Sequence, residues 1–142
     1  MTAKEYLMQI WDLDREIDIK CKALEQMRSQ IGIRQQPDNQ DRVVGSGYPQ
    51  DQIPDIVIKI VTMEECLNRK IDKLIDLKAK ILDQIDGMES RTYRNILMCR
   101  YVLMMNWDDV AESVGYAVQH CYRIHGRALQ EFYRLYLKDE SK

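Results

Sequence analysis

The sequence is poor in residues that break helices. Of its 142 residues, six are Gly and three are Pro, and there is a single Phe. Leu, Ile, Met, Lys, Glu, Gln and Arg are common, and these residue types favour helix over sheet. The length and the 45% hydrophobic fraction suit one ordinary globular domain, or a small domain with an appendage. The sequence therefore predicts an all-α protein.

Long hydrophobic runs are missing too. No apolar stretch approaches the roughly 20 residues that a membrane span needs. The opening "MTAKEYLMQIWDLDREID" lacks the charged, then apolar, then small-residue pattern of a signal peptide. We therefore expect a cytoplasmic protein with no membrane contact.

The Cys and His residues are not spaced as the ligands of a metal site usually are. The cysteines contain no C-x-x-C pair, which favours reduced thiols in a cytosolic protein; they are Cys21, Cys66, Cys99 and Cys121. His120 and His125 are five residues apart, a poor interval for sharing one helical face. The sequence predicts no metal site.

Signatures of catalysis are also lacking. There is no Gly-rich phosphate loop and no pairing of a nucleophile with a base. Asp108 and Asp109 are adjacent, and neighbouring residues on a helix point about 100° apart. We expect these carboxylates to favour a helix N-terminus through the helix dipole. The prediction is a protein that is not an enzyme and holds no cofactor.

Charge is distributed unevenly along the chain. Residues 1–90 carry 13 Lys or Arg and 17 Asp or Glu, whereas residues 91–138 carry 7 and 4, with both histidines. The net charge of −2 thus conceals a basic segment. Such asymmetry favours a nucleic-acid partner for that segment.

Two long helices are predicted before that segment. The first runs from Ala3 to Ile31, after a capping-box spacing of Thr2 and Glu5, and Gly32 should end it. The second starts at Pro54 or Asp55 and runs to Met88. Both carry heptad-like apolar positions: in the first, Ala3, Tyr6, Ile10, Leu13, Ile17, Leu24, Met27 and Ile31; in the second, Val57, Ile60, Leu67, Ile71, Leu74, Ile81, Ile85 and Met88.

These helices predict an antiparallel coiled-coil hairpin over residues 1–89, with an irregular connector at 32–53. Either helix could instead supply the seam of a homo-oligomer. The periodicity leaves the choice between an intramolecular hairpin and a larger bundle open.

Residues 90–138 predict a second, helix-turn-helix domain. A helix closed by Asn106 is followed by a short helix, "WDDVAESVG", and by a last helix over residues 117–137. A helix-turn-helix needs a small residue where the two helices cross, a glycine or similar at the turn, and an apolar inner face. The candidate packing residues are Trp107, Ala111, Gly115, Val118 and Ile124.

The outer face of the last helix would present hydrogen-bonding and basic side chains. Gln pairs with adenine and Arg with guanine in the major groove, while Tyr, His and Arg also hold phosphates. The predicted base contacts are Gln119, His120, Tyr122 and Arg123, and the predicted phosphate contacts are Arg127, Arg94 and Arg91. A three-helix cluster with Arg and His on a solvated face would give a similar pattern.

The segment from Trp107 to Leu129 resembles sigma factor region four. The shared features are the pairs Val110-Ala111, Val114-Gly115 and Ala128-Leu129, with Val118, Cys121 and Ile124 between them. That family usually has Ser or Thr before the recognition helix, where this chain has Ala117. The substitution removes a cap worth about 1 kcal/mol and a side chain that often contacts phosphate.

Nearly the whole chain resembles small phage and prophage proteins of Gram-positive bacteria. These include a sigma-like family of unknown function and the ArpU-like late transcription regulators. The stretches that carry the resemblance are "AKEYLMQIWDLDREIDIK", "DRVVGSGYPQD", "RKIDKLIDLKAKILDQID" and "RYVLMMNWDDVAESVGYAVQHCYRIHGRALQEF". The resemblance implies a regulator that binds double-stranded DNA, with host RNA polymerase as a further candidate partner, and it implies no enzymatic activity.

Two other functions fit the same pattern. A DNA-packaging adaptor similar to a small terminase subunit would also join a helix-turn-helix to helices that oligomerise. A protein-interaction module would use the coiled coil and would bind no DNA.

Overall fold

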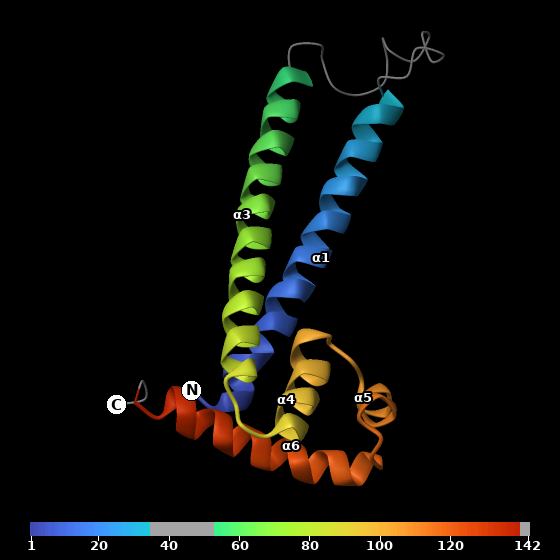
Figure 1. Cartoon of the computed structure of the whole chain (residues 1–142). Helices are drawn as coiled ribbons and strands as arrows, with labels where there is room; N and C mark the ends of the chain where they lie inside the picture. Colours follow the sequence, from blue (N-terminus) through green and yellow to red (C-terminus); the bar gives the residue numbers. More distant parts are fainter. Residues whose placement is uncertain (35–52, 140–142) are drawn as a thin grey trace. The chain divides into compact units, whose positions relative to one another are not determined.

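A computed structural model of the chain describes residues 1–34 and 53–139. Figure 1 shows that these residues form helices, and no strand occurs among them, which confirms the all-α prediction. The elements are α1 (Ala3–Arg34), α3 (Ile53–Asp86), α4 (Arg91–Leu97), the π-helix η3 (Met98–Val102), α5 (Trp107–Val114), α6 (Val118–Phe132) and the π-helix η4 (Tyr133–Leu137). None of the helices in these ranges combines the length and the apolar character that a membrane crossing requires.

The start of α1 has the predicted capping box. The Glu5 backbone N–H donates to Thr2 Oγ1 (3.1 Å), and the Thr2 N–H donates to Glu5 Oε2 (3.0 Å). The predicted end is wrong by three residues, because α1 continues through Gly32 to Arg34. A glycine inside a helix costs only about 1 kcal/mol relative to alanine, which the neighbouring helical residues can offset.

The predicted bounds of the second long helix are close to those observed, since α3 begins at Ile53 and ends at Asp86. Most of the predicted connector, residues 35–52, lies outside the described part of the chain.

The described residues divide into two compact units, and the two long helices contribute to both. One unit is Arg15–Asp72, and the other combines Met1–Asp14 with Lys73–Lys142. Neither unit is therefore a continuous segment ending near residue 89.

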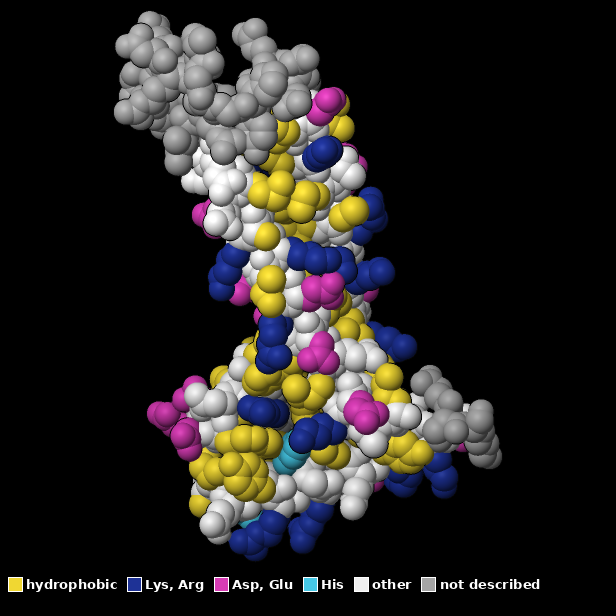
Figure 2. All heavy atoms as spheres, turned by 180° about the vertical axis from the view of Figure 1, so that it is seen from behind, with side chains coloured by type: hydrophobic (Ala, Val, Ile, Leu, Met, Phe, Trp, Pro, Cys, Tyr) yellow, Lys and Arg dark blue, Asp and Glu magenta, His cyan; other side chains and the backbone are white. Residues whose placement is uncertain are grey.

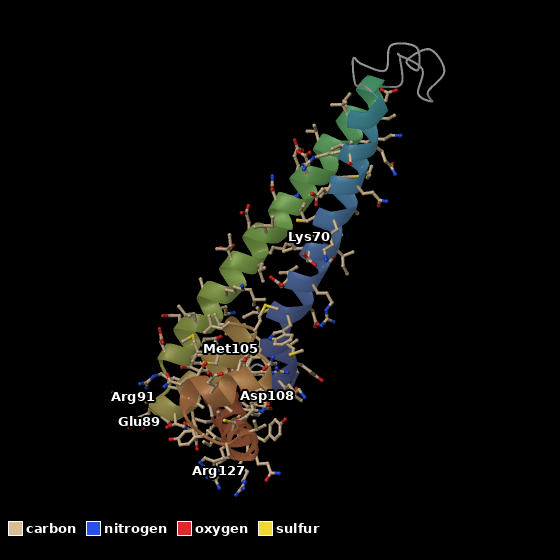
Figure 3. The ribbon with its side chains drawn as sticks, turned by 90° about the vertical axis from the view of Figure 1, so that its right-hand side faces the viewer. Lys70, Glu89, Arg91, Met105, Asp108 and Arg127 are labelled. Atoms are coloured by element: carbon tan, nitrogen blue, oxygen red, sulfur yellow. The ribbon has the colours of Figure 1, made fainter. Side chains whose placement is uncertain are left out.

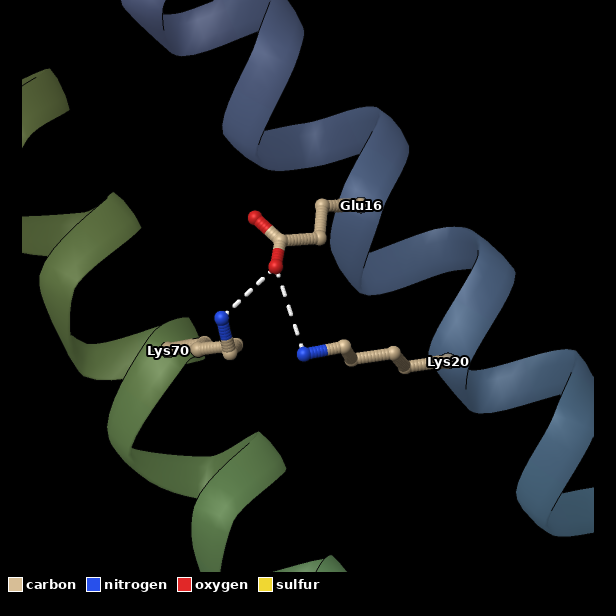
Figure 4. Close-up of polar contacts among 3 residues, drawn as sticks. All are labelled: Glu16, Lys20 and Lys70. Atoms are coloured by element: carbon tan, nitrogen blue, oxygen red, sulfur yellow. Dashed lines mark hydrogen bonds and ion pairs between the residues drawn. The ribbon is translucent and has the colours of Figure 1, made fainter.

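In the unit Arg15–Asp72, segments of α1 and α3 lie side by side and run in opposite directions. Arg28 Nε donates to Glu64 Oε1 (2.9 Å), while Glu16, earlier in α1, accepts from Lys70, later in α3 (2.7 Å). Figure 4 shows that Lys20 reaches the same Glu16 oxygen, at 3.2 Å. The buried apolar side chains of this unit are Ile17, Leu24, Ile60 and Leu67.

One predicted seam residue of α3 does not lie in a core. Val57 is 44% exposed. Val57 lies seven positions before Glu64, the partner of Arg28, and thus close to the start of α3. The apolar period of α3 thus extends to a position that is exposed.

In the other unit, the start of α1 and the end of α3 pack with the helices that follow. Tyr6 Oη donates to Gln84 Oε1 (2.8 Å), and the Tyr6 ring lies 5.8 Å from that of Phe132. The largest fully buried side chains are Leu7, Ile10, Ile81, Ile85, Met88, Ile96, Leu97, Tyr101, Val110, Cys121 and Phe132. Residues 1–14 thus belong to the core on which α6 rests.

The predicted single helix ending at Asn106 is wrong. α4 passes into η3, whose wider turn shows as a bond from the Leu103 N–H to the Met98 carbonyl (2.9 Å). Met104 then adopts a left-handed backbone (φ 58°), and the chain reverses. Asn106 is the N-cap of α5, since its Oδ1 accepts from the Asp109 N–H (2.9 Å).

Candidate nucleic-acid interface

The turn between α5 and α6 depends on Gly115. Gly115 has φ 80° and ψ 26°, the left-handed conformation that side chains disfavour. Its N–H and that of Tyr116 both donate to the Ala111 carbonyl, at 2.9 and 3.2 Å. A Cβ at residue 115 would meet nothing within 4 Å, so the requirement for glycine is conformational rather than spatial.

α6 begins without a side-chain cap, as expected from Ala117. The backbone of Ala117 is extended, and its side chain makes no capping hydrogen bond to the start of the helix. The inner face of α6 is apolar and buried; its residues are Cys121, Ile124, Ala128 and Phe132. Val118, predicted among the packing residues, is only partly buried.

The outer face of α6 carries all five side chains predicted there. Gln119, His120, Tyr122, Arg123 and Arg127 are all exposed. Neither Arg123 nor Arg127 makes an ion pair or hydrogen bond with another residue of the described ranges. In Figure 3 the Arg127 side chain projects outward from the helix. This face therefore presents two guanidinium groups that are free to meet an anion.

Two of the predicted packing residues, Trp107 and Ala111, lie in α5. Val110 and Ala111 are buried, which brings the inner faces of α5 and α6 together. Trp107, at the start of α5, is partly exposed. Its ring makes edge contacts with two α6 side chains, Tyr122 (centroids 4.9 Å apart, planes at 75°) and His125 (4.7 Å, 73°).

The two arginines of α4 differ from those of α6. Arg94 is partly buried, and its Nη1 donates to the carbonyls of Met88 (2.6 Å) and Glu89 (3.0 Å). It thereby satisfies carbonyls just past the end of α3. Arg91 is exposed at the first position of α4. The phosphate contacts predicted for both arginines stay predictions. The Arg94 guanidinium already donates to two backbone carbonyls.

An aromatic and cationic cluster behind this face was not predicted. The Arg100 guanidinium lies over the rings of Trp11 (4.6 Å to the centroid) and Trp107 (4.8 Å). Trp11 Nε1 donates to the Arg100 carbonyl (3.0 Å), and Arg100 Nη1 donates to the Met105 carbonyl (2.8 Å). Arg100 thus joins α1 to the loop before α5.

His125 belongs to this cluster rather than to the exposed face. Its Nε2 lies 2.7 Å from the Tyr101 hydroxyl. Burial, with Lys4 and Arg100 nearby, lowers the pKa of His125 to about 4, and burial raises the pKa of Tyr101 to about 12. Both groups are therefore neutral at pH 7. The helical period indicates that His125 faces the core, because His125 follows the buried Cys121 by four residues and adjoins Ile124.

The described ranges contain no group of three or more His, Cys, Asp or Glu side chains that could hold a metal ion. The four cysteines are free thiols; Cys21 and Cys66 are exposed, and Cys121 is buried. Burial raises the pKa of the Cys99 and Cys121 thiols, which lowers their reactivity as nucleophiles.

The fold and the outer face of α6 define an all-helical protein. Its basic helix α6 has no side-chain cap and directly follows a glycine turn. The chain belongs to the family described as a protein of unknown function (DUF1492), whose model matches residues 33–133. The match takes in α3 to α6 and stops one residue after α6. No curated protein and no solved structure matched the chain.

Proposed function

We propose that this chain is a sequence-specific DNA-binding transcription regulator of the phage and prophage type. In this proposal α5, the turn at Gly115 and α6 form a helix-turn-helix similar to sigma factor region four. The segment 117–137 enters the major groove, and residues 90–138 carry the DNA-binding function. The protein acts in the cytoplasm.

One observation carries the proposal. Five polar or basic side chains lie on the outer face of a helix that directly follows a left-handed glycine turn, and two of them are arginines without a partner in the described ranges. Arg and Gln are the side chains that read guanine and adenine edges bidentately. An exposed arginine near a negatively charged duplex gains free energy from counterion release.

The long helices have a separate role in this proposal. We infer that they form an antiparallel coiled-coil hairpin, which mediates self-association or contact with host RNA polymerase. The opposite directions of the α1 and α3 segments in the unit Arg15–Asp72 support the hairpin. Its charged surface, with the ion pairs of Glu16 and Arg28, would set the register of the helices.

The test is selection of bound fragments from a random duplex pool. Wild type should enrich a defined motif, and Arg123→Ala should lose that enrichment. Arg15→Ala is the matched control, because it removes the same charge from an exposed position of α1. Loss of the motif in Arg123→Ala alone would support groove reading by α6. No enrichment by wild type, or equal enrichment by all three proteins, would overturn the proposal.

A second candidate function is a DNA-packaging adaptor. Apolar side chains reach the surface along the long helices (Figure 2), and those exposed in the unit Arg15–Asp72 include Ile19, Val57, Ile58, Val61 and Met63. Exposed apolar side chains on long helices favour self-association. A ring-sized oligomer in light scattering would favour the adaptor, whereas a monomer or dimer would favour the regulator. Oligomerisation without any DNA binding would indicate a protein-interaction module.

A further inference from the structure

Two side chains on the outer face of α6 are held by aromatic rings that come from outside α6. Trp107 contacts Tyr122, as described above. Tyr116, which directly follows the glycine of the turn, contacts His120 with ring centroids 5.0 Å apart and planes at 85°. Gln119 and Arg123, on the same face, have no ring against them in the described residues.

The Tyr116–His120 contact is not part of a core. The Tyr116 side chain is 42% exposed and His120 is exposed, so burial of the two rings accounts for little of the fold's stability. The Tyr116 backbone is nevertheless fixed, since its N–H donates to the Ala111 carbonyl (3.2 Å). A ring anchored on the turn therefore lies against an exposed side chain of α6.

Fixing an exposed side chain before binding removes part of the entropy cost of association. An exposed histidine samples several rotamers. A ring packed edge-on against it favours the rotamer that keeps the contact. The nitrogen atoms of His120 would then meet a base edge or phosphate in one geometry.

We propose that Tyr116 is a positioning residue for His120, so that the turn selects the conformation in which His120 contacts DNA. This inference rests on the proposed DNA-binding function and adds a residue to its site. The role belongs to the ring rather than to the hydroxyl, because the contact is between ring faces and edges. Tyr116→Phe should therefore behave as wild type, and Tyr116→Leu should not.

The experiment is a double-mutant cycle on full-length protein. Affinities are measured at one salt concentration for the duplex selected by wild type and for a scrambled duplex. The variants are Tyr116→Phe, Tyr116→Leu, His120→Ala and the double variant Tyr116→Leu/His120→Ala. Leu82→Ala is the control, because Leu82 is exposed to a similar extent (40%) in the same unit but lies outside residues 90–138. Thermal melting checks that every variant folds.

We expect Tyr116→Leu to weaken binding of the selected duplex by about two- to tenfold, the range for one edge-to-face aromatic contact. Binding of the scrambled duplex should not change, and in the His120→Ala background the same substitution should have no further effect. The ring-proton resonances of His120 in the free protein should shift in Tyr116→Leu and stay in place in Tyr116→Phe.

Additive losses in the cycle, or equal losses on both duplexes, would overturn the positioning role while leaving the DNA-binding function intact. An unshifted His120 spectrum in Tyr116→Leu would also overturn it. A wild-type protein that does not distinguish the two duplexes would overturn the proposed function itself, a result separate from that of the spectrum.

Discussion

The Tyr101 hydroxyl lies 2.7 Å from Nε2 of His125 and joins the π-helix η3 to α6. The pKa of His125 is lowered to about 4, chiefly by burial. In the unfolded chain its pKa is about 6.5. Between these values the unfolded state binds a proton that the folded state rejects. Stability should therefore be greatest above pH 6.5 and should fall as the pH drops toward 4.

The fall attributable to His125 should be at most about 1.4 kcal/mol per pH unit. Urea unfolding at several values between pH 7.5 and 4.5 would measure it, with His125→Gln as the comparison. The amide keeps a hydrogen-bonding group near Tyr101 but does not titrate. An equally steep slope in His125→Gln would show that other groups cause the pH dependence.

Gly115 and Gly126 should respond to alanine in opposite directions. Gly115 has a left-handed backbone, so Gly115→Ala should destabilise the fold by about 1 to 2 kcal/mol. Gly126 lies within α6 with open space around it, so Gly126→Ala should stabilise by about 0.5 to 1 kcal/mol. Denaturant midpoints would compare the two variants. A similar loss in both would contradict the conformational explanation.

Arg94 and Arg91 form a matched pair on α4. Arg94→Ala leaves the carbonyls of Met88 and Glu89 without their charged donor. It should cost about 1 to 2 kcal/mol of unfolding free energy. Arg91 is exposed, and Arg91→Ala should change stability by less than about 0.5 kcal/mol. Equal stabilities of the two variants would rule out the structural role of Arg94.

Arg123 and Arg127 should separate specificity from affinity in the proposed function. Arg127→Ala should weaken binding equally on all duplexes and lower the slope of log K against log salt by about 1. Arg123→Ala should narrow the difference between selected and scrambled duplexes. Titrations at several salt concentrations would test both expectations. Unchanged affinities in both variants would contradict the assignment of this face to DNA.

Much of the helical fold could be predicted, because the apolar period persists over many turns. The bounds of α1 and α3 agree with the predicted ones to within three residues. The exposure of Gln119 and Arg123 follows from the same period, once Cys121 and Ile124 face inward. These properties depend on residues close together in one helix, so they can be predicted from short stretches of the sequence.

The remaining features depend on contacts between distant residues or on unusual backbone. Trp11 and Arg100 are 89 positions apart, yet a hydrogen bond joins them. The reversal after η3 uses a left-handed methionine, Met104, a residue type that gives no indication of such a conformation. The hydrogen bonds of Arg94 to the Met88 and Glu89 carbonyls likewise depend on where α3 ends.

The division of the long helices between the two units determines how this protein can be dissected. Phe132 of α6 contacts the Tyr6 ring, and Arg100 of η3 contacts Trp11. A fragment that starts at residue 90 would lose both aromatic partners. Deleting only the first 14 residues would remove both partners too, although the deletion lies more than a hundred positions before α6. We therefore expect the proposed DNA-binding part to fold together with residues 1–14, which belong to the same unit.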